Sequence, residues 1–129
     1  MKKIIIYFST LFILPFSACA QTKGDRIILG KSYAQQELKS SLVDKKQHNV
    51  IDYRSIIIKD SLTAINTAEP ILFSIYGKNN IIKQKPYETY LIDNYWILTG
   101  TLPKDYMGGT FLIIINAFDG KIIKITHGK

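Results

Sequence analysis

Residues 68–129 decide the fold, and they read AEPILFSIYGKNNIIKQKPYETYLIDNYWILTGTLPKDYMGGTFLIIINAFDGKIIKITHGK. The segment opens with the second half of a helix-like pattern and then holds four runs rich in β-branched and aromatic residues. Such runs favour β-strands, and the Asp, Asn, Gly and Pro residues between them favour turns. We therefore expect a helix followed by four strands.

The last two runs, 110–118 and 121–126, flank the pair Asp119-Gly120. An Asp-Gly pair between two strand-like runs predicts a two-residue type I′ turn, because both central residues of that turn need positive φ. We therefore expect 110–118 and 121–126 to form an antiparallel hairpin.

The register of this hairpin follows from the turn. A two-residue turn would place Ile114 opposite Ile125 and Leu112 opposite His127. Both faces of the run 110–118 are then apolar, which is typical of a central strand covered on both sides. The alternative is that one face serves as a partner surface, and we favour the covered strand.

A second hairpin precedes the first. The runs 87–92 and 95–102 flank Asp93-Asn94, two residue types that tolerate positive φ. The expected cross-strand partners are Leu91 with Trp96 and Tyr90 with Ile97. Such pairs stabilise a sheet, so the second hairpin should extend the first into four antiparallel strands.

A helix is expected over 61–76, before the sheet. Its apolar residues recur at helical spacing, Asp60 is a good N-cap, and Gly77 suits the position after the C-terminus. Pro70 should kink or divide the helix, because proline removes a backbone hydrogen bond. The fold class is therefore α+β, with helices packed on a curved antiparallel sheet.

The N-terminal half carries weaker patterns. Residues 26–29 are expected to form a short strand, and 53–58 a strand or an extended lead-in. Residues 32–46 form a plausible helix with Ser32 as its N-cap.

Residues 1–20 have the pattern of a secretory signal peptide: two lysines, a short apolar core and then small residues. The apolar run is too short to span a bilayer. Ala18-Cys19-Ala20 fits a cleavage site before Gln21, whereas 16–19 resemble a bacterial lipobox. We favour the lipobox, because Cys19 is the single cysteine of the chain and stands where a lipoprotein needs it. The protein is then expected in the periplasm, anchored to a membrane by lipid on Cys19.

The mature chain, 21–129, has the length of one domain. With Cys19 used in processing it holds no disulfide. The chain has 17 basic and 10 acidic residues, and losing Lys2 and Lys3 lowers the net charge from +7 to +5. The basic residues are scattered and form no stripe interleaved with aromatics, so nucleic-acid binding is not expected.

No constellation of residues points to catalysis, a metal ion or a cofactor. The sequence offers two histidines, no cysteine cluster and no activated nucleophile. Gly100 predicts a bulge or a close approach, and 104–109 should form a loop. The simplest interpretation of 104–107 is an ordinary solvated loop. Tyr and Met on a loop also suit recognition, so the candidate partner-binding residues are Lys104, Tyr106, Met107 and Trp96. For Trp96 the alternative is a place in the core, which we favour.

Several short motifs occur in order between residues 61 and 129. They are AE with IL at 68–72, IYGK at 75–78, QKPY at 84–87, YW at 95–96, GTLP at 100–103, GGTF at 108–111, DGK at 119–121 and ITHGK at 125–129. As an ordered series they resemble the bacterial immunity proteins with a nuclear-transport-factor-two-like fold. The resemblance implies a cone-like α+β domain that binds and neutralises a protein toxin and is no enzyme.

Two other classes of function stay open at the level of the sequence. A domain of this fold could hold a small ligand or an active site in its cone, which a convergent set of Asp, His and Tyr would indicate. It could also be a structural lipoprotein of the envelope. We favour the immunity function.

Overall fold

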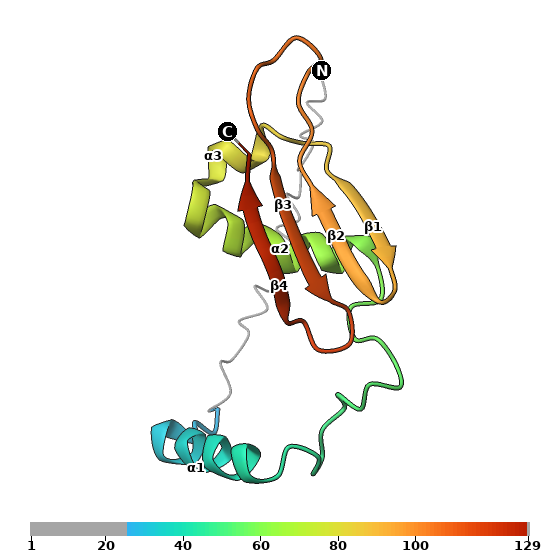
Figure 1. Cartoon of the computed structure of the whole chain (residues 1–129). Helices are drawn as coiled ribbons and strands as arrows, with labels where there is room; N and C mark the ends of the chain where they lie inside the picture. The colour runs from blue at the N-terminus through green and yellow to red at the C-terminus, as the bar shows by residue number, and fades with distance from the viewer. Residues whose placement is uncertain (1–25, 129) are drawn as a thin grey trace, which may run out of the picture.

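The computed structural model describes residues 26–128 and has three helices and one sheet in that part (Figure 1). In chain order the elements are α1 (Gly30–Val43), α2 (Ser61–Tyr76), α3 (Lys78–Ile82), β1 (Glu88–Ile92), β2 (Tyr95–Thr99), β3 (Phe111–Asn116) and β4 (Ile122–His127). The strands form one antiparallel sheet in the order β1-β2-β3-β4, so the predicted α+β class and four-strand sheet are confirmed. The expected signal peptide, 1–20, lies outside the described residues.

Helix α2 has the predicted bounds. At its N-terminus the Thr63 amide donates to the Asp60 carboxylate at 2.8 Å, and this bond lowers the pKa of Asp60. At its C-terminus Gly77 has φ 85° and its amide donates to the Phe73 carbonyl. The helix runs through Pro70 without a break, so the division considered for that position does not occur.

The β1–β2 hairpin is the one that the sequence predicts. Asp93 and Asn94 both have positive φ, as a type I′ turn requires. The pairs Leu91–Trp96 and Tyr90–Ile97 are confirmed.

The β3–β4 hairpin differs from the prediction. Only Gly120 of the Asp119-Gly120 pair has positive φ, and the Asn116 amide bonds to the Lys121 carbonyl across a loop of four residues, 117–120. This loop shifts the ladder by two residues from the predicted register, and a bulge further along β4 restores one of them, so Ile113 pairs with Ile125. The predicted pairing of Leu112 with His127 is wrong for the same reason, since His127 lies opposite Phe111.

A bulge in β4 adds a second shift to this hairpin. Ile114 lies opposite Lys124 whereas Ile115 lies opposite Ile122, so Ile123 has no direct partner. The bulge keeps Ile122 and Ile125 packed against the core although the register changes between them.

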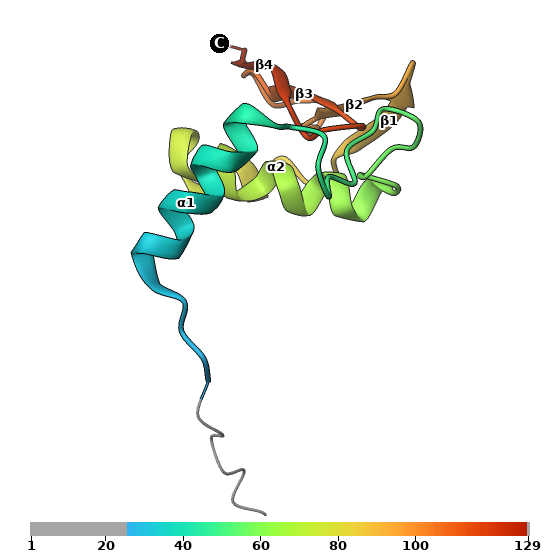
Figure 2. The same cartoon turned by 90° about the horizontal axis from the view of Figure 1, so that it is seen from below.

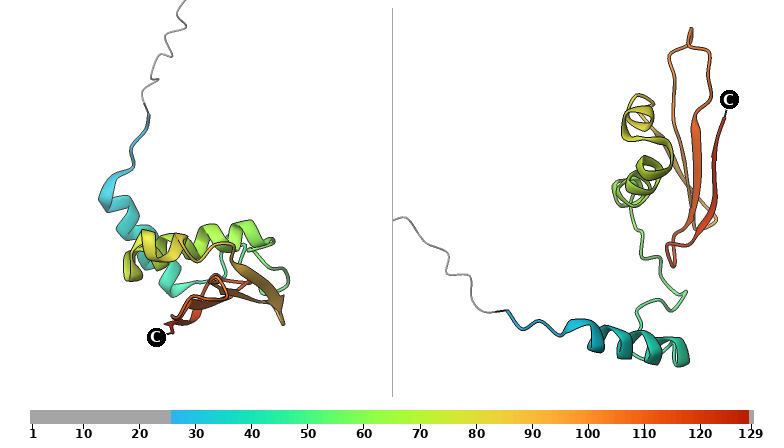
Figure 3. Two further views of the ribbon diagram at one scale, coloured as in Figure 1. Left: turned by 90° about the horizontal axis from the view of Figure 1, so that it is seen from above. Right: turned by 90° about the vertical axis from the view of Figure 1, so that its left-hand side faces the viewer.

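Helices cover one face of the sheet only (Figure 3). Residues Phe111, Ile113 and Ile115 of β3 point toward α2 and are buried, while Leu112, Ile114 and Asn116 point the other way and are partly exposed. The prediction that β3 is covered on both faces is therefore wrong for the described residues. Its two apolar faces reflect one core face and one open face.

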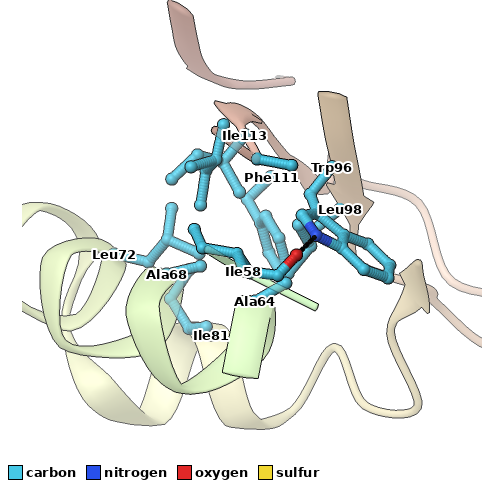
Figure 4. Close-up of a cluster of buried hydrophobic side chains, with 11 residues drawn as sticks. Ile58, Ala64, Ala68, Leu72, Ile81, Trp96, Leu98, Phe111 and Ile113 are labelled. Atoms are coloured by element: carbon cyan, nitrogen blue, oxygen red, sulfur yellow. Dashed lines mark hydrogen bonds between the residues drawn. The ribbon is translucent and has the colours of Figure 1, made fainter. Parts of the chain in front are cut away.

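The core lies between α2, α3 and the covered face of the sheet (Figure 4). Ala64, Ala68 and Leu72 form the buried stripe of α2, and small alanines let the helix lie close to the strands. Trp96 is 6 % exposed, and its indole N–H donates to the Ile58 carbonyl at 2.8 Å. Trp96 therefore belongs to the core, as we expected from the sequence.

The segment before α2 is bent and forms no strand, with bends at 53–55 and at Ile57 and a positive φ of 59° at Tyr53. The amides of Ile57 and Ile58 both donate to the Ala117 carbonyl, at 2.9 and 3.1 Å. The ring of Tyr53 packs against Phe118 with 5.9 Å between centroids. Residues 53–58 thus fasten the chain to the β3–β4 turn through a bent segment, and the predicted strand or extended lead-in is wrong.

The N-terminal predictions need correction. Residues 26–29 are not a strand, and α1 begins at Gly30 and ends at Val43 instead of spanning 32–46. Ser32 is not its N-cap, because Leu29 holds that position without a side-chain cap. No residue of α1 is buried, and Figure 1 shows the helix standing apart from the sheet. A partial apolar stripe did not bring this helix into the core.

Gln84 joins four parts of the fold beside the core. It is 1 % exposed. Its Oε1 accepts from the Phe111 amide at 2.9 Å, and its Nε2 donates to the Asn80 carbonyl at 2.8 Å. Its backbone carbonyl accepts from the Thr101 amide at 2.8 Å. The residue thus connects the end of α3 to the end of β2 and the start of β3.

The remaining hydrogen of the Gln84 amide points to His127, where Nε2 lies 3.0 Å from Gln84 Nε2. His127 Nδ1 lies 2.7 Å from the Gly128 carbonyl oxygen, which can only accept, so Nδ1 carries the proton. Nε2 then accepts from Gln84. The partners on both sides therefore fix the tautomer of His127, and its ring has a structural role.

Replacing Gln84 by leucine should lower the free energy of unfolding. Gln84→Leu leaves the buried Phe111 amide without an acceptor, and we expect a loss of about 2–3 kcal/mol, since a buried polar group left unpaired costs about 1–3 kcal/mol. The measurement is urea unfolding of the variant and the parent. Gln35→Leu, on exposed α1, is the control and should change the stability by less than about 0.5 kcal/mol. Equal effects would contradict the role given to Gln84.

Two adjacent glycines offer a second comparison. A Cβ at Gly109 would lie 2.0 Å from the Gly128 carbonyl carbon, whereas a Cβ at Gly108 would meet nothing closer than 3.5 Å. Gly109→Ala should therefore cost about 1–3 kcal/mol, as overpacking does, because a backbone must move. Gly108→Ala should be tolerated. Thermal unfolding of both variants tests this difference, and two indistinguishable midpoints would refute it.

Candidate partner-binding surface

The loop between β2 and β3 projects from one end of the sheet (Figure 1). Within it Tyr106 is 55 % exposed and Met107 is 96 % exposed, and Lys104 is exposed as well. The Tyr106 amide donates to the Pro103 carbonyl at 3.0 Å, which forms a turn at the tip. Three of the four candidate residues thus lie together on one exposed turn.

The fourth candidate, Trp96, lies elsewhere. Its side chain fills the core and its polar atom is used by the Ile58 carbonyl. A partner would meet little of the indole. Trp96 is therefore not part of the exposed surface that Lys104, Tyr106 and Met107 form.

A second exposed region is the uncovered side of the sheet. Its apolar members, which we call the open face, are Tyr90, Ile92, Tyr95, Ile97, Leu112 and Ile114. They share one side because residues directly opposite each other in a ladder point the same way. Among the described residues no helix lies over them (Figure 3). An exposed apolar patch of this kind on a small domain marks an interaction surface.

The open face and the loop are connected through the same two strands. β2 leads into the loop from Thr99 and β3 leaves it at Phe111. Thr99 fixes this exit, because its hydroxyl donates to the Phe111 carbonyl at 3.0 Å. A partner that lies along the outer side of β2 and β3 would therefore reach the tip of the loop as well.

An ion pair ties α2 to the segment before β1. Lys85 Nζ lies 2.7 Å from Glu69 Oε1, and the Tyr87 hydroxyl donates to the same oxygen at 3.0 Å. Burial and the neighbouring carboxylate raise the pKa of Tyr87, so its hydroxyl stays protonated. Tyr87 also packs edge-on against Phe111, with 5.0 Å between ring centroids. This cluster positions the first strand and leaves no free group for chemistry.

A cavity of about 890 Å³ lies outside the sheet, between the end of α1, residues 44–54 and Asp119. Its lining includes Asp, His and Tyr, the residue types that would indicate a ligand site. However, Asp44 accepts from the amides of residues 46 and 47, Asp52 accepts from the Arg54 amide, and Asp119 accepts from the Tyr53 hydroxyl. These carboxylates stabilise turns, and the cavity is not the interior of the fold.

The structure places no metal-binding group in the part of the chain that it describes. Within residues 26–128, no three His, Cys, Asp or Glu side chains lie close enough to share an ion. No helix there has the length and apolar character needed to cross a membrane.

Four of the eight motifs that carry the sequence resemblance come together at one end of the sheet. QKPY at 84–87, GTLP at 100–103, GGTF at 108–111 and ITHGK at 125–129 all touch the Gln84 network. A Cβ at Gly100 would lie 2.2 Å from Gln84 Oε1, which explains the glycine there and confirms the close approach predicted for it. These motifs shape the base from which the loop projects.

Residues 63–129, just over half of the chain, match a family described as NTF2 fold immunity protein. The chain belongs to this family. The match begins inside α2 and includes the whole sheet, so the family domain is the packed part of the fold. The resemblance seen in the sequence is thereby confirmed, and α1 lies outside it.

Two curated relatives each match somewhat more than half of the chain. The uncharacterized protein YhhH of Escherichia coli (strain K12) is 34 % identical over 74 residues, which are 57 % of this chain and 58 % of YhhH. The uncharacterized protein YbbC of the same organism is 32 % identical over 73 residues, 56 % of this chain and 60 % of YbbC. The matched region thus spans about three fifths of each relative. No solved structure matches the chain.

The sequence allowed a partner surface on one face of β3, but the apolar residues on both of its faces favoured a covered strand. The signal was present in the neighbouring strands. Lys124 and Thr126 of β4 point to the same side as Ile114 and Leu112. Polar residues beside apolar ones on one face indicate a side that meets water or a partner, and not a second core.

Proposed function

We propose that this protein is an immunity protein that binds a bacterial protein toxin and neutralises it without catalysis. The observation that carries the proposal is the match of residues 63–129 to an immunity family. Two features of the chain agree with it. The exposed apolar side chains lie on a rigid sheet, and the polar groups of the interior are used to hold the fold.

The proposed binding surface is the turn Lys104, Tyr106 and Met107 together with the open face. Aromatic and methionine side chains supply most of the affinity of protein interfaces when they are buried by the partner. The sheet behind them is pre-formed, so little conformational freedom is lost on binding. The mechanism is occlusion: the toxin's working surface is covered by a surface that exists before the two meet.

The alternative is a structural lipoprotein of the envelope, and the match to an immunity family favours the immunity function over it. Such a protein needs no toxin partner, so the two functions differ in one observable. An immunity protein protects a cell against one toxin, and a structural protein protects against none.

Truncating the exposed tyrosine should weaken toxin binding. We expect Tyr106→Ala to cost about 1–3 kcal/mol of binding free energy and to leave the fold intact, as the truncation of interface aromatics does. The measurement is titration calorimetry against the toxin encoded beside this gene. Tyr33→Ala, on exposed α1 outside the family domain, is the matched control and should bind like the parent. If both variants bind like the parent, the turn is not the binding surface.

Lys104 should act on the rate of association. A charge at the rim of an interface steers the approach of the partner, so Lys104→Glu should slow association to an acidic toxin surface while changing dissociation little. The difference should shrink at high salt, because salt screens charges over distances of about 10 Å at 0.1 M. Stopped-flow mixing at two salt concentrations measures it, and an association rate that is independent of the residue at 104 would contradict the steering role.

The test of the function itself is protection. The adjacent candidate toxin is exported to the periplasm with and without this protein, and survival and recovery of a complex are measured. We expect survival only in the presence of this protein. Equal killing in both cases, with no complex recovered, would show that the protein is not an immunity protein for that toxin.

We further propose that the protein is exported and anchored by lipid on Cys19. The lipobox-like residues 16–19 support this location, and a toxin acting in the periplasm would meet its inhibitor there. The native protein should fractionate with membranes, and Cys19→Ser should release it, because the acyl chains are lost. Mass spectrometry of the mature N-terminus distinguishes a lipid-modified Cys19 from an unmodified Gln21. An unmodified N-terminus at Gln21 would establish a soluble periplasmic form.

A further inference from the structure

Strand β1 is an exposed sheet edge without the usual protection. Its five residues, ETYLI, contain no lysine, no proline and no bulge. Tyr90 is 51 % exposed, and Leu91 and Ile92 are exposed too. Natural proteins protect a free edge with such devices, because an unprotected edge pairs readily with another strand. We therefore expect another strand to pair with the free edge of β1.

The opposite edge shows the protection that β1 lacks. β4 carries the bulge at Ile123, and Lys124 lies beside it. Lys121, the residue directly before β4, is exposed at the turn. A bulge and lysines are two of the common ways to stop an edge from pairing. One sheet thus has one protected edge and one unprotected edge.

The hydrogen-bond pattern shows which groups of β1 are free. The residues that flank a two-residue turn form a hydrogen-bonded pair, and such pairs alternate along the ladder. Ile92, Tyr90 and Glu88 therefore bond to β2. The bonds from Ala117 to Asn94 and from Gly100 to Phe111 agree, because they put the even-numbered residues of β2 toward β3. Thr89 and Leu91 must then point their backbone groups outward.

No other described segment uses those outward groups. Among residues 26–128, no backbone hydrogen bond outside the regular ladders involves Thr89 or Leu91. Figure 1 shows β1 as the last strand of the sheet with no strand beyond it. Two amides and two carbonyls are thus available along a short straight edge.

We propose that β1 pairs antiparallel with β1 of a second copy of this chain, so that two sheets join into one of eight strands. The two-fold axis passes beside Tyr90. In that register Thr89 lies opposite Leu91 of the partner copy and Leu91 opposite Thr89, and each pair exchanges both of its hydrogen bonds. All four outward groups of each copy are then satisfied by the same groups of the other copy, as a two-fold interface requires.

The side chains agree with this register. Glu88 lies opposite Ile92 of the second copy, so no like charges face each other. The two Tyr90 rings stand side by side on the open face, and aromatic cross-strand pairs stabilise a sheet. The two open faces become continuous and the turns at 104–107 stay free. The second copy is preferred over a toxin strand because β1 is complementary to itself in this register, with all its outward backbone groups paired and no like charges opposite each other.

A cysteine at the two-fold axis tests the register. A non-hydrogen-bonded antiparallel pair has its Cα atoms about 4.5 Å apart, within the range for a disulfide. In the full-length chain carrying Cys19→Ser, which removes the native thiol, Tyr90→Cys should form a covalent dimer under mild oxidation. The dimer is measured by non-reducing electrophoresis at several protein concentrations. Trapping is suitable because an edge of five residues is smaller than a standard interface and its dimer should be weak.

Two controls separate this pairing from random collision. Tyr106→Cys has a similar exposure, 55 %, and lies far along the chain from β1, so its dimer should form at least about tenfold more slowly. Thr89→Cys would be about 8 Å from its own copy across the axis, too far for a disulfide. Equal rates for Tyr90→Cys and Tyr106→Cys would overturn the proposal.

A non-covalent readout completes the test. Tyr90→Lys places two lysines opposite each other, and we expect it to weaken the dimer by about tenfold or more, whereas Tyr90→Phe should keep it. Sedimentation of both variants measures this, with urea unfolding to show that they fold alike. Hydrogen exchange at Thr89 and Leu91 that slows with protein concentration supports the dimer. Exchange that slows only when toxin is added would make the toxin the occupant and overturn the proposal.

Discussion

The structure depends on one buried side chain, Gln84. Its amide oxygen accepts from the Phe111 amide, and its amide nitrogen bonds to the Asn80 carbonyl and to the His127 ring. The core itself is a thin layer between helices α2 and α3 and one side of a small sheet. Apolar packing in such a layer does not by itself fix where the strands end. The side-chain amide of Gln84 fixes where β3 begins and β4 ends, because it forms hydrogen bonds with both the Phe111 amide and the His127 ring.

This constraint explains the four family motifs that surround Gln84. Gly100 and Gly109 are glycines because a Cβ would strike Gln84 in one case and the backbone of Gly128 in the other. These four motifs therefore record how one end of the fold is packed, and they do not locate a partner-binding surface. Tyr106 and Met107 lie just outside them, on the turn that this packing supports.

What the sequence could predict follows the range of the forces involved. Helix α2 and the turn at Asp93-Asn94 depend on neighbours in the chain, and both are as predicted. The turn at Asp119-Gly120 is not, because Ala117 is held by the Ile57, Ile58 and Asn94 backbones, which widens the loop. Likewise the partial apolar stripe of α1 does not determine whether the helix packs against the core, and no residue of α1 is buried. The candidate loop was visible as a loop, but the burial of Trp96 and the open face depend on which side of the sheet α2 covers.

The residues that stabilise the fold are separate from the exposed residues that can be substituted without loss of stability. The covered face, the Gln84 network and the Glu69–Lys85 pair hold the sheet from one side and one end. The open face and the turn at Tyr106 contribute no group to that network, so substitutions there act on partners more than on stability. An immunity protein needs this separation, because it must follow changes in its toxin while keeping its fold. A sheet supported on one side only provides it: the covered side keeps the strands in register, and the uncovered side is free to be fitted to another protein.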